Sequence, residues 1–292
     1  MNRRRAMTAL GAGLASLACT RAKPVPVGSK DGSESRLLGE ILYRAIDNRV
    51  AGGAVRHPEM GRTQTLHQAM MMGEVDVCPE YTAAAHSEIL KAPPVSDASV
   101  VFERVKLDYH NQFRQEWFAP LGFQATFVVV VAAADARFQA VSAISELAGL
   151  KTALKLAVTP AFASRIDGHA SLVKAYAINA RLLAQTSDAA APLYQALAEG
   201  RADAIVGTAS DGALLDPRWK ILADDRSAFL PSQACMVARV DALASHPDLR
   251  DVLSSLSGKI SNETMRKLNQ KVDSGQDVSA VASGFLVSVA SS

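Results

Sequence analysis

The sequence predicts an α/β protein built from two lobes of similar construction, and two observations support this prediction. First, strand-like segments alternate with segments of helical periodicity along the chain, which is typical of helices layered on sheets. Second, one segment occurs twice, at residues 66–77 and 193–204, with Leu, Gln, Ala, Gly and Asp at the same offsets. In each copy we expect a helix to end at a glycine, Gly73 or Gly200, because glycine adopts the left-handed cap conformation without steric cost. A ligand in such a protein is expected between the lobes, at the carboxyl ends of the strands.

The first half of the chain contains alternating strand and helix patterns. A dense β-branched run at 126–131 predicts a central strand, and a Pro-rich connection covers 91–99. Thr63 is a candidate N-cap for the first repeat helix, because its hydroxyl can accept from a free backbone N–H. The other expected elements are a strand at 25–29, a helix at 34–48 and an amphipathic helix at 102–118.

The second half continues the alternation. Residues 142–147 open a helix with a capping-box pattern, in which Ser142 and Ser145 can cap and Glu146 favours the first turn. The C-terminal segment from 248 is helical, with a break at Gly258 and a new start at Ser261. The remaining expected elements are strands at 153–158, 203–206, 220–222 and 234–238 and helices at 172–176 and 192–200.

The N-terminal residues 1–22 have the pattern of an export signal followed by a short linker. Three arginines precede an apolar stretch at 6–18 that is too short to span a bilayer stably. Cys19 follows Ala18 directly, as in a bacterial lipoprotein, so both lipid anchoring and soluble export remain open. The arginine run permits twin-arginine as well as general export. A periplasmic or other extracytoplasmic location is therefore expected.

The composition excludes several functional classes. Hydrophobic residues make up 49% of the 292 residues, charged residues 21%, and the net charge is only +2, so nucleic-acid binding is not expected. The six histidines lack zinc-ligand spacing, and the sequence has no G-x-S-x-G motif. We therefore expect no metal site, no cofactor and no catalytic residues. Cys78 and Cys235 lie in apolar, strand-like segments and are interpreted as buried thiols, with a disulfide as the alternative.

Several short motifs occur in a consistent order along the chain. They include the loop at 27–35, the segment Gly-Glu-Val-Asp-Val-Cys-Pro-Glu-Tyr-Thr at 73–82 and Pro-Leu-Gly-Phe at 120–123 followed by Thr126. Arg-Ile-Asp-Gly at 165–168, Ser-Asp-Gly at 210–212 and the segment 257–273 complete the set. Together they resemble the substrate-binding proteins of osmoprotectant (glycine betaine/carnitine/choline) ABC importers.

This resemblance implies a type II periplasmic binding protein fold, with two α/β lobes joined by a two-strand hinge. Lobe 1 is expected to be discontinuous, at 25–126 plus 232–292, and lobe 2 to cover 127–231. The chain would cross between the lobes near Thr126 and Ser232. Closure of the lobes on a ligand is the expected motion.

The resemblance also implies a set of ligand-binding residues. In that family aromatic faces surround a quaternary ammonium group, which cation–π attraction stabilises. Tyr81 keeps the family's tyrosine, and Phe127 keeps a ring without the hydroxyl. Thr208 and Ser232 stand where aromatic residues are usual, so about half of the aromatic box is missing. The remaining expected ligand-binding residues are Lys30 and Arg165, with Arg165 placed to bind a ligand carboxylate.

Four of these residues, and Glu34 beside them, also have a purely structural interpretation. Lys30 and Glu34 are alternatively solvated loop charges, and Arg165 a surface arginine paired with Asp167. Tyr81 and Phe127 are alternatively ordinary core residues.

The resemblance implies an extracytoplasmic protein, not an enzyme, that captures a small zwitterionic or quaternary-ammonium-type solute and delivers it to an ABC permease. A monomer is expected. The alternatives are an enzyme or a sensor module on the same two-lobed fold.

Overall fold

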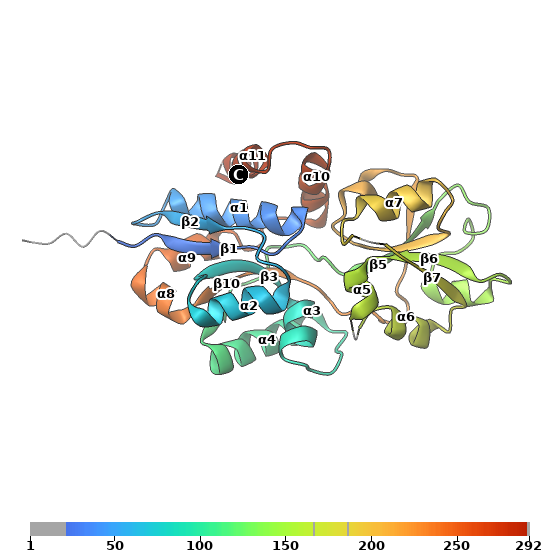
Figure 1. Ribbon diagram of the computed structural model, residues 1–292, viewed down its shortest axis with the longest axis horizontal. Coiled ribbons are helices and arrows are strands. Elements are labelled where there is room, and N and C mark those ends of the chain that lie inside the picture. The colour runs from blue at the N-terminus through green and yellow to red at the C-terminus, as the bar shows by residue number, and fades with distance from the viewer. Residues whose placement is uncertain (1–21, 166, 186, 291–292) are drawn as a thin grey trace, which may run out of the picture.

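The computed structural model describes residues 22–165, 167–185 and 187–290, and it contains two five-stranded mixed sheets (Figure 1). The strand order of the first sheet is β2-β1-β3-β10-β4 and that of the second is β7-β6-β8-β5-β9. The strands of the first sheet, in this spatial order, are Ala54–His57, Val25–Gly28, Val77–Tyr81, Ala234–Arg239 and Gln115–Trp117. Those of the second are Ala180–Ala184, Leu154–Val158, Ala204–Thr208, Phe127–Ala132 and Trp219–Leu222. We call the first sheet with its helices lobe 1 and the second lobe 2.

The two sheets share one pattern of strand directions. In each sheet three neighbouring strands are parallel, β2-β1-β3 and β7-β6-β8, and the last two strands pair antiparallel. The repeated sequence segment lies mainly in the helix before the third strand of each sheet and ends on the first residue of that strand, β3 in lobe 1 and β8 in lobe 2. The repeat therefore marks equivalent places in two lobes of similar build.

Helices surround both sheets, and α10 lies beside lobe 2 (Figure 1). Those of the first part of the chain are α1 Ser33–Asp47, α2 Thr63–Met72, α3 Thr82–Ala84, the π-turn η1 Ala85–Ile89 and α4 Ala98–Phe113. Those between β5 and β9 are the 3₁₀ helix η2 Ile144–Gly149, α5 Pro160–Ser164, α6 His169–Tyr176, α7 Ala191–Ala198 and the 3₁₀ helix η3 Gly212–Leu215. The C-terminal ones are α8 Val240–Ser245, α9 Leu249–Ser255, α10 Asn262–Asp273 and α11 Val278–Ala290.

Apolar side chains are buried in separate clusters within each lobe. In lobe 1, residues such as Leu37 and Ile41 of α1 belong to one cluster, and Trp117 of β4 belongs to another. In lobe 2, Phe162 and Leu193 likewise belong to different clusters. Helices on both faces explain why the parallel strands read as continuous apolar runs.

Some expected boundaries are wrong. The expected helix at 102–118 occurs as α4, which begins earlier and ends at Phe113. Arg114 then adopts a left-handed conformation at φ 53°, and β4 follows. Thr63 is not the N-cap of α2, because the cap position is Arg62 and the Thr63 hydroxyl instead accepts from Lys30 Nζ.

The capping prediction at residues 142–147 is also partly wrong. The segment forms the short η2 rather than an α-helix. Glu146 Oε2 accepts from the backbone N–H groups of Ser142 and Ala143, at 2.5 and 3.0 Å, so this carboxylate caps the turn. By contrast, Ser261 caps α10 as predicted, since its hydroxyl accepts from Thr264 N–H. Within the described part of the chain, no helix combines the length and hydropathy needed to cross a bilayer.

Candidate solute-binding site

The six predicted ligand-binding residues lie at the ends of strands and in the segments that connect the lobes. Tyr81 ends β3, Thr208 ends β8, and Phe127 opens β5 opposite Thr208. Lys30 follows β1 and Arg165 follows α5, the helix after β6. The parallel strands β3 and β8 therefore end at two of these residues, and β1 ends two residues before a third, Lys30, which matches the expectation for ligand sites in α/β proteins.

The structure brings Lys30 and Tyr81 together in lobe 1. The Lys30 ammonium lies 4.6 Å from the centre of the Tyr81 ring and pairs with the Glu80 carboxylate. Its side chain is only 12% exposed, so it is not a solvated loop charge. Glu80 also accepts from the Tyr81 backbone N–H at 2.8 Å. A single carboxylate thus holds both the cation and the strand end that carries the ring.

Glu34 of α1 completes this group. Tyr81 donates its hydroxyl to Glu34 Oε1 at 2.5 Å, and Asn269 of α10 donates to Glu34 Oε2 at 2.7 Å. Burial, reinforced by the Glu34 charge, raises the pKa of the Tyr81 hydroxyl well above its usual value. Tyr81 therefore stays a neutral donor, and Glu34 is held by two neutral donors.

Arg165 bridges the two lobes. Its guanidinium donates in a bidentate pair to Asp167, with both distances 2.8 Å, as the structural interpretation of this residue expected. It also donates to Glu88 Oε1 at 2.5 Å and to the Ser87 hydroxyl at 3.1 Å, both in η1 of lobe 1. With 13% of its side chain exposed, it is a largely buried group rather than a surface arginine. Its forked donors already bind carboxylates of the protein itself.

Phe127 lies beside Arg165 and two other rings. The Arg165 guanidinium carbon is 5.5 Å from the Phe127 ring centre. Phe127 makes edge-to-face contacts with Phe162 and Phe229, at centroid distances of 4.8 and 6.0 Å. This geometry places one partly exposed ring at the edge of the lobe 2 core.

Thr208 binds a buried carboxylate. Asp211 accepts from the Thr208 hydroxyl at 2.6 Å and from the Thr208 backbone N–H and the Tyr194 hydroxyl, both at 2.9 Å. Burial raises the pKa of Asp211 to about 6, against the opposing effect of these hydrogen bonds, and the charge of Glu34 contributes in the same direction as burial. Asn269 spans the two lobes here, since it donates both to Glu34 and, at 2.9 Å, to the Ser210 carbonyl.

Ser232 lies where the chain crosses between the lobes. Its carbonyl accepts from Ala125 N–H at 2.8 Å, and its own N–H donates to the Thr126 hydroxyl at 3.1 Å. Gln124 and Gln233 form an antiparallel bridge beside these bonds. Ser232 is thus joined directly to the other crossing segment.

The predicted residues therefore form a Lys30–Tyr81 pair in lobe 1, a group of Phe127, Arg165 and Thr208 in lobe 2, and Ser232 at the crossing. Their roles in ligand binding stay predictions. Sequence reasoning assigned no binding role to their charged and amide partners. Several of those partners stand inside motifs already quoted, so the motifs contained a usable signal. These partners are Glu34, Glu80, Glu88, Asp167, Asp211 and Asn269.

Cys78 and Cys235 are free, buried thiols. Among the residues that the structure describes, no group of three or more His, Cys, Asp or Glu side chains is placed to hold a metal ion.

Comparison with known proteins gives a consistent result. Residues 23–288 match the family described as the substrate binding domain of ABC-type glycine betaine transport systems. The carnitine transport binding protein OpuCC of Listeria monocytogenes is 29% identical over 265 residues, covering 90% of this chain and 85% of that protein. The ergothioneine transport permease/ergothioneine binding protein EgtU of Helicobacter pylori is 29% identical over 251 residues, covering 86% of this chain and 45% of that protein.

A solved structure of a glycine betaine/carnitine/choline ABC transporter protein superposes with a TM-score of 0.79 at 25% identity, over 90% of this chain and 98% of that one. This similarity confirms the predicted type II periplasmic binding protein fold. The family consists of extracytoplasmic substrate-binding proteins of ABC importers and not of enzymes, which confirms the predicted role in solute capture for import. The chain belongs to the family of substrate-binding domains of ABC-type glycine betaine transport systems.

Proposed function

We propose that this protein captures a small solute with a positively charged nitrogen group between lobe 1, at 25–126 plus 232–292, and lobe 2, at 127–231. The solute contacts Lys30, Tyr81, Phe127, Arg165, Thr208 and Ser232. The relatives support a quaternary ammonium group, because carnitine and ergothioneine both carry one.

The observation that carries this proposal is an excess of negative charge where the lobes meet. Lys30 is paired with Glu80, and Arg165 with Asp167 and Glu88. Glu34 and Asp211, one from each lobe, are held by neutral hydroxyl and amide donors. Their charge is therefore not balanced by the groups that bind them, and a solute cation between the lobes would supply the balance.

The rings and the arginine define the rest of the solute. Phe127 offers a partly exposed aromatic face for a methylated ammonium group, worth about 0.5–2 kcal/mol. The Tyr81 ring is only 9% exposed and already has the Lys30 ammonium 4.6 Å from its centre, so it can receive the solute only on its other face. A solute carboxylate can bind Arg165 only in exchange for Glu88 or Asp167, because these carboxylates occupy its donors. The affinity for a carboxylate on the solute is thus reduced by the loss of an internal ion pair.

A thermal-shift screen of the mature protein tests this proposal. The panel contains glycine betaine, carnitine, proline betaine, ergothioneine and choline, the last of which lacks a carboxylate. A solute present at 100 times its dissociation constant stabilises the protein by about 2.7 kcal/mol. We expect a shift with at least one quaternary ammonium solute and a loss of that shift in Phe127→Leu.

Arg165→Gln tests the binding of the solute's carboxylate separately from that of its ammonium group. It should change the affinity for solutes that carry a carboxylate differently from that for choline, because only the former can bind the guanidinium, whereas the Arg165–Glu88 pair contributes to closure on every solute. Arg137→Gln is the matched control, because Arg137 pairs with Asp135 and Asp203 at 2.6 and 2.9 Å in lobe 2, beyond the opposite end of β5. A panel without any shift, or equal effects of the two arginine variants, would contradict the proposed site.

The finer features of the assembly are part of this proposal. We expect a monomer that docks on an ABC permease, which light scattering on the purified protein measures directly. Lipid anchoring through Cys19 falls outside the residues that the structure describes, as does the whole export signal up to residue 21. Mass spectrometry of the membrane fraction tests it.

A further inference from the structure

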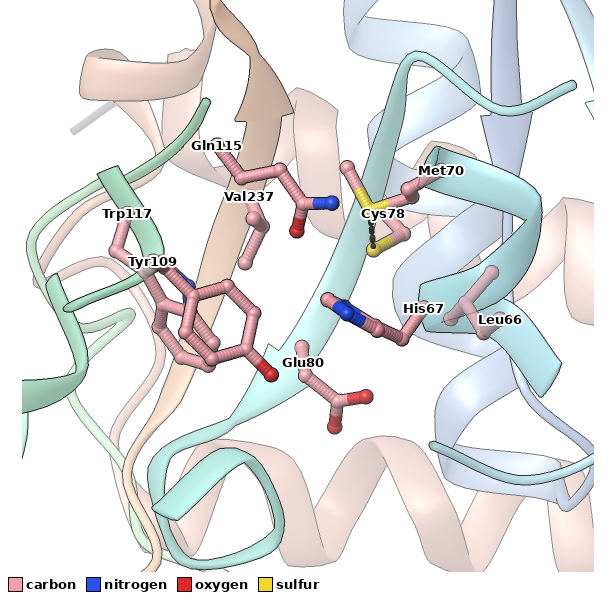
Figure 2. A pocket seen from close by; sticks show the side chains of 9 residues that line it. All are labelled: Leu66, His67, Met70, Cys78, Glu80, Tyr109, Gln115, Trp117 and Val237. Carbon is pink, nitrogen blue, oxygen red and sulfur yellow. Dashed lines mark hydrogen bonds between the residues drawn. The ribbon is translucent and has the colours of Figure 1, made fainter. Parts of the chain in front are cut away.

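A small cavity lies inside lobe 1, behind the strand that carries Tyr81 (Figure 2). Helix α2 contributes His67 and Met70, three residues apart and therefore on one helix face. β3 contributes Cys78, and β4 contributes Gln115 and Trp117. The volume open to the centre of a water molecule is about 10 Å³, which admits one small occupant and excludes an organic solute.

Two sulfur atoms and an imidazole converge on this cavity. The Cys78 Sγ–H donates to Met70 Sδ at a distance of 3.2 Å. Figure 2 shows the His67 ring beside these sulfurs, between them and Glu80. The Nδ1 atom of His67 is buried and has no hydrogen-bond partner among the described residues.

Two further polar atoms of the cavity wall also lack partners. Gln115 Oε1 and Trp117 Nε1 make no hydrogen bond within the described structure, although both residues are only 1% exposed. Buried polar atoms are nearly always satisfied in native proteins, so the unpaired His67 Nδ1 indicates a missing occupant. The indole N–H of Trp117 can only donate, so it takes no part in binding a cation. Thiols and thioethers are weak acceptors, which makes the sulfur-lined side of the cavity a poor water site.

We propose that this cavity binds a single monovalent soft metal ion, copper(I), through Cys78 Sγ, Met70 Sδ and the His67 imidazole. Thiolate and thioether sulfur favour copper(I), and imidazole is also a copper ligand. On binding, the Cys78 thiol releases its proton to solvent and the thiolate forms the metal bond, so the metal keeps its oxidation state.

Charge distinguishes copper(I) from divalent metals at this place. One thiolate neutralises one copper(I) ion, and the Glu80 carboxylate, which also lines the cavity, is paired with Lys30. The complex therefore adds no net charge at a place where Cys78 is 2% exposed. Zinc(II) with the same three ligands would leave one uncompensated positive charge, which is costly to bury. The proposal is independent of the identity of the solute bound between the lobes.

Competition with a chromogenic copper(I) chelator, under anaerobic reducing conditions, measures this binding on the mature protein. We expect one equivalent of copper(I) per chain, with X-ray absorption showing two sulfur neighbours and one nitrogen neighbour. Met70→Leu and Cys78→Ser should each weaken binding by more than about tenfold, because even the loss of an outer-shell partner costs 10–100-fold. Met70→Leu is close to volume-conserving, so it keeps the test informative where Cys78→Ser does not fold.

Cys235→Ser is the matched control, because Cys235 is equally buried but does not line the cavity. It should bind copper(I) like the wild type. Met71 and Met72 are exposed, so a loss of binding in a Met71→Leu/Met72→Leu double variant would assign the metal to the surface and overturn the proposal. The proposal would also be overturned if the chelator removed all copper(I) from the protein, or if Met70→Leu bound copper(I) as tightly as the wild type.

Discussion

Asp211 gives the sharpest prediction about stability, because its carboxylate is buried and bound only by neutral donors. Its pKa is raised to about 6 from an ordinary value near 3.8. A rise of about two pH units corresponds to about 3 kcal/mol at 1.36 kcal/mol per unit. Below about pH 3 the group is protonated in both the folded and the unfolded state. Between pH 4 and 6 the unfolded chain ionises first, so stability falls as the pH rises, and above pH 6 the full cost is present.

Asp211→Asn removes this cost and keeps the shape. An amide oxygen can accept from Thr208 N–H and the Tyr194 hydroxyl, and the amide nitrogen can donate to the Thr208 hydroxyl, which then acts as acceptor. In urea unfolding, the free energy of the variant minus that of the wild type should rise by about 2.5 kcal/mol between pH 4 and pH 8. The other titrating groups cancel in this difference.

Asp216→Asn is the control, because Arg218 holds the pKa of this exposed carboxyl below its ordinary value. Its difference from the wild type should change with pH in the opposite direction. A flat difference for Asp211→Asn from pH 4 to pH 8 would refute the buried-charge argument.

Two further predictions concern the backbone and the thiols. Gly73 has φ 77° and an added Cβ would lie 2.9 Å from Arg239 Nη1, so Gly73→Ala should lower the unfolding free energy by about 1–2 kcal/mol. Gly284 lies in open space on α11, so Gly284→Ala should raise the unfolding free energy by about 0.5–1 kcal/mol. Equal effects of the two variants on the urea midpoint would contradict the argument. Burial raises the pKa of both Cys78 and Cys235, so these thiols should be unreactive in the folded protein. At pH 8 a thiol reagent should modify two thiols in the denatured mature chain freed of Cys19 and none in the folded chain. Rapid labelling of the folded protein would show that the strands open.

Local sequence patterns predicted the elements with strong periodicity or clear end signals. The run at 126–131 became β5, and Ser261 caps α10, because β-branched residues and a cap hydroxyl act within a few residues. β4 was assigned to a helix because apolar spacing continues past Phe113. The break depends on Arg114 in a left-handed conformation, for which the sequence has no glycine signal. Short edge strands such as β2 and β7 contain too few residues to show the alternation of apolar and polar side chains that predicts a strand, so the sequence did not predict them.

The candidate site was predicted as a set of positions but not as a set of contacts. Resemblance located Arg165, whereas its partner Glu88 lies 77 residues away and is brought close only by the packing of η1 against lobe 2. The same holds for Asn269, which reaches Glu34 across 235 residues. Ion pairs between distant segments follow from tertiary structure, and no local period encodes them.

The pairing between the two crossing segments limits how the lobes move. Ala125 and Ser232 are bonded to each other through the backbone, and Thr126 binds Ser232 N–H through its hydroxyl. The crossing segments are also bonded to the lobes, since Gln233 exchanges hydrogen bonds with Thr82 of lobe 1 and the Thr126 carbonyl accepts from Ala209 N–H of lobe 2. Bending the segments must therefore preserve or replace these bonds. The free-energy difference between open and closed forms then depends on contacts such as Arg165–Glu88 and Arg62–Asp188, which join the lobes away from the crossing. The strength of those ion pairs would then contribute to how much of the solute's binding energy is spent on closure.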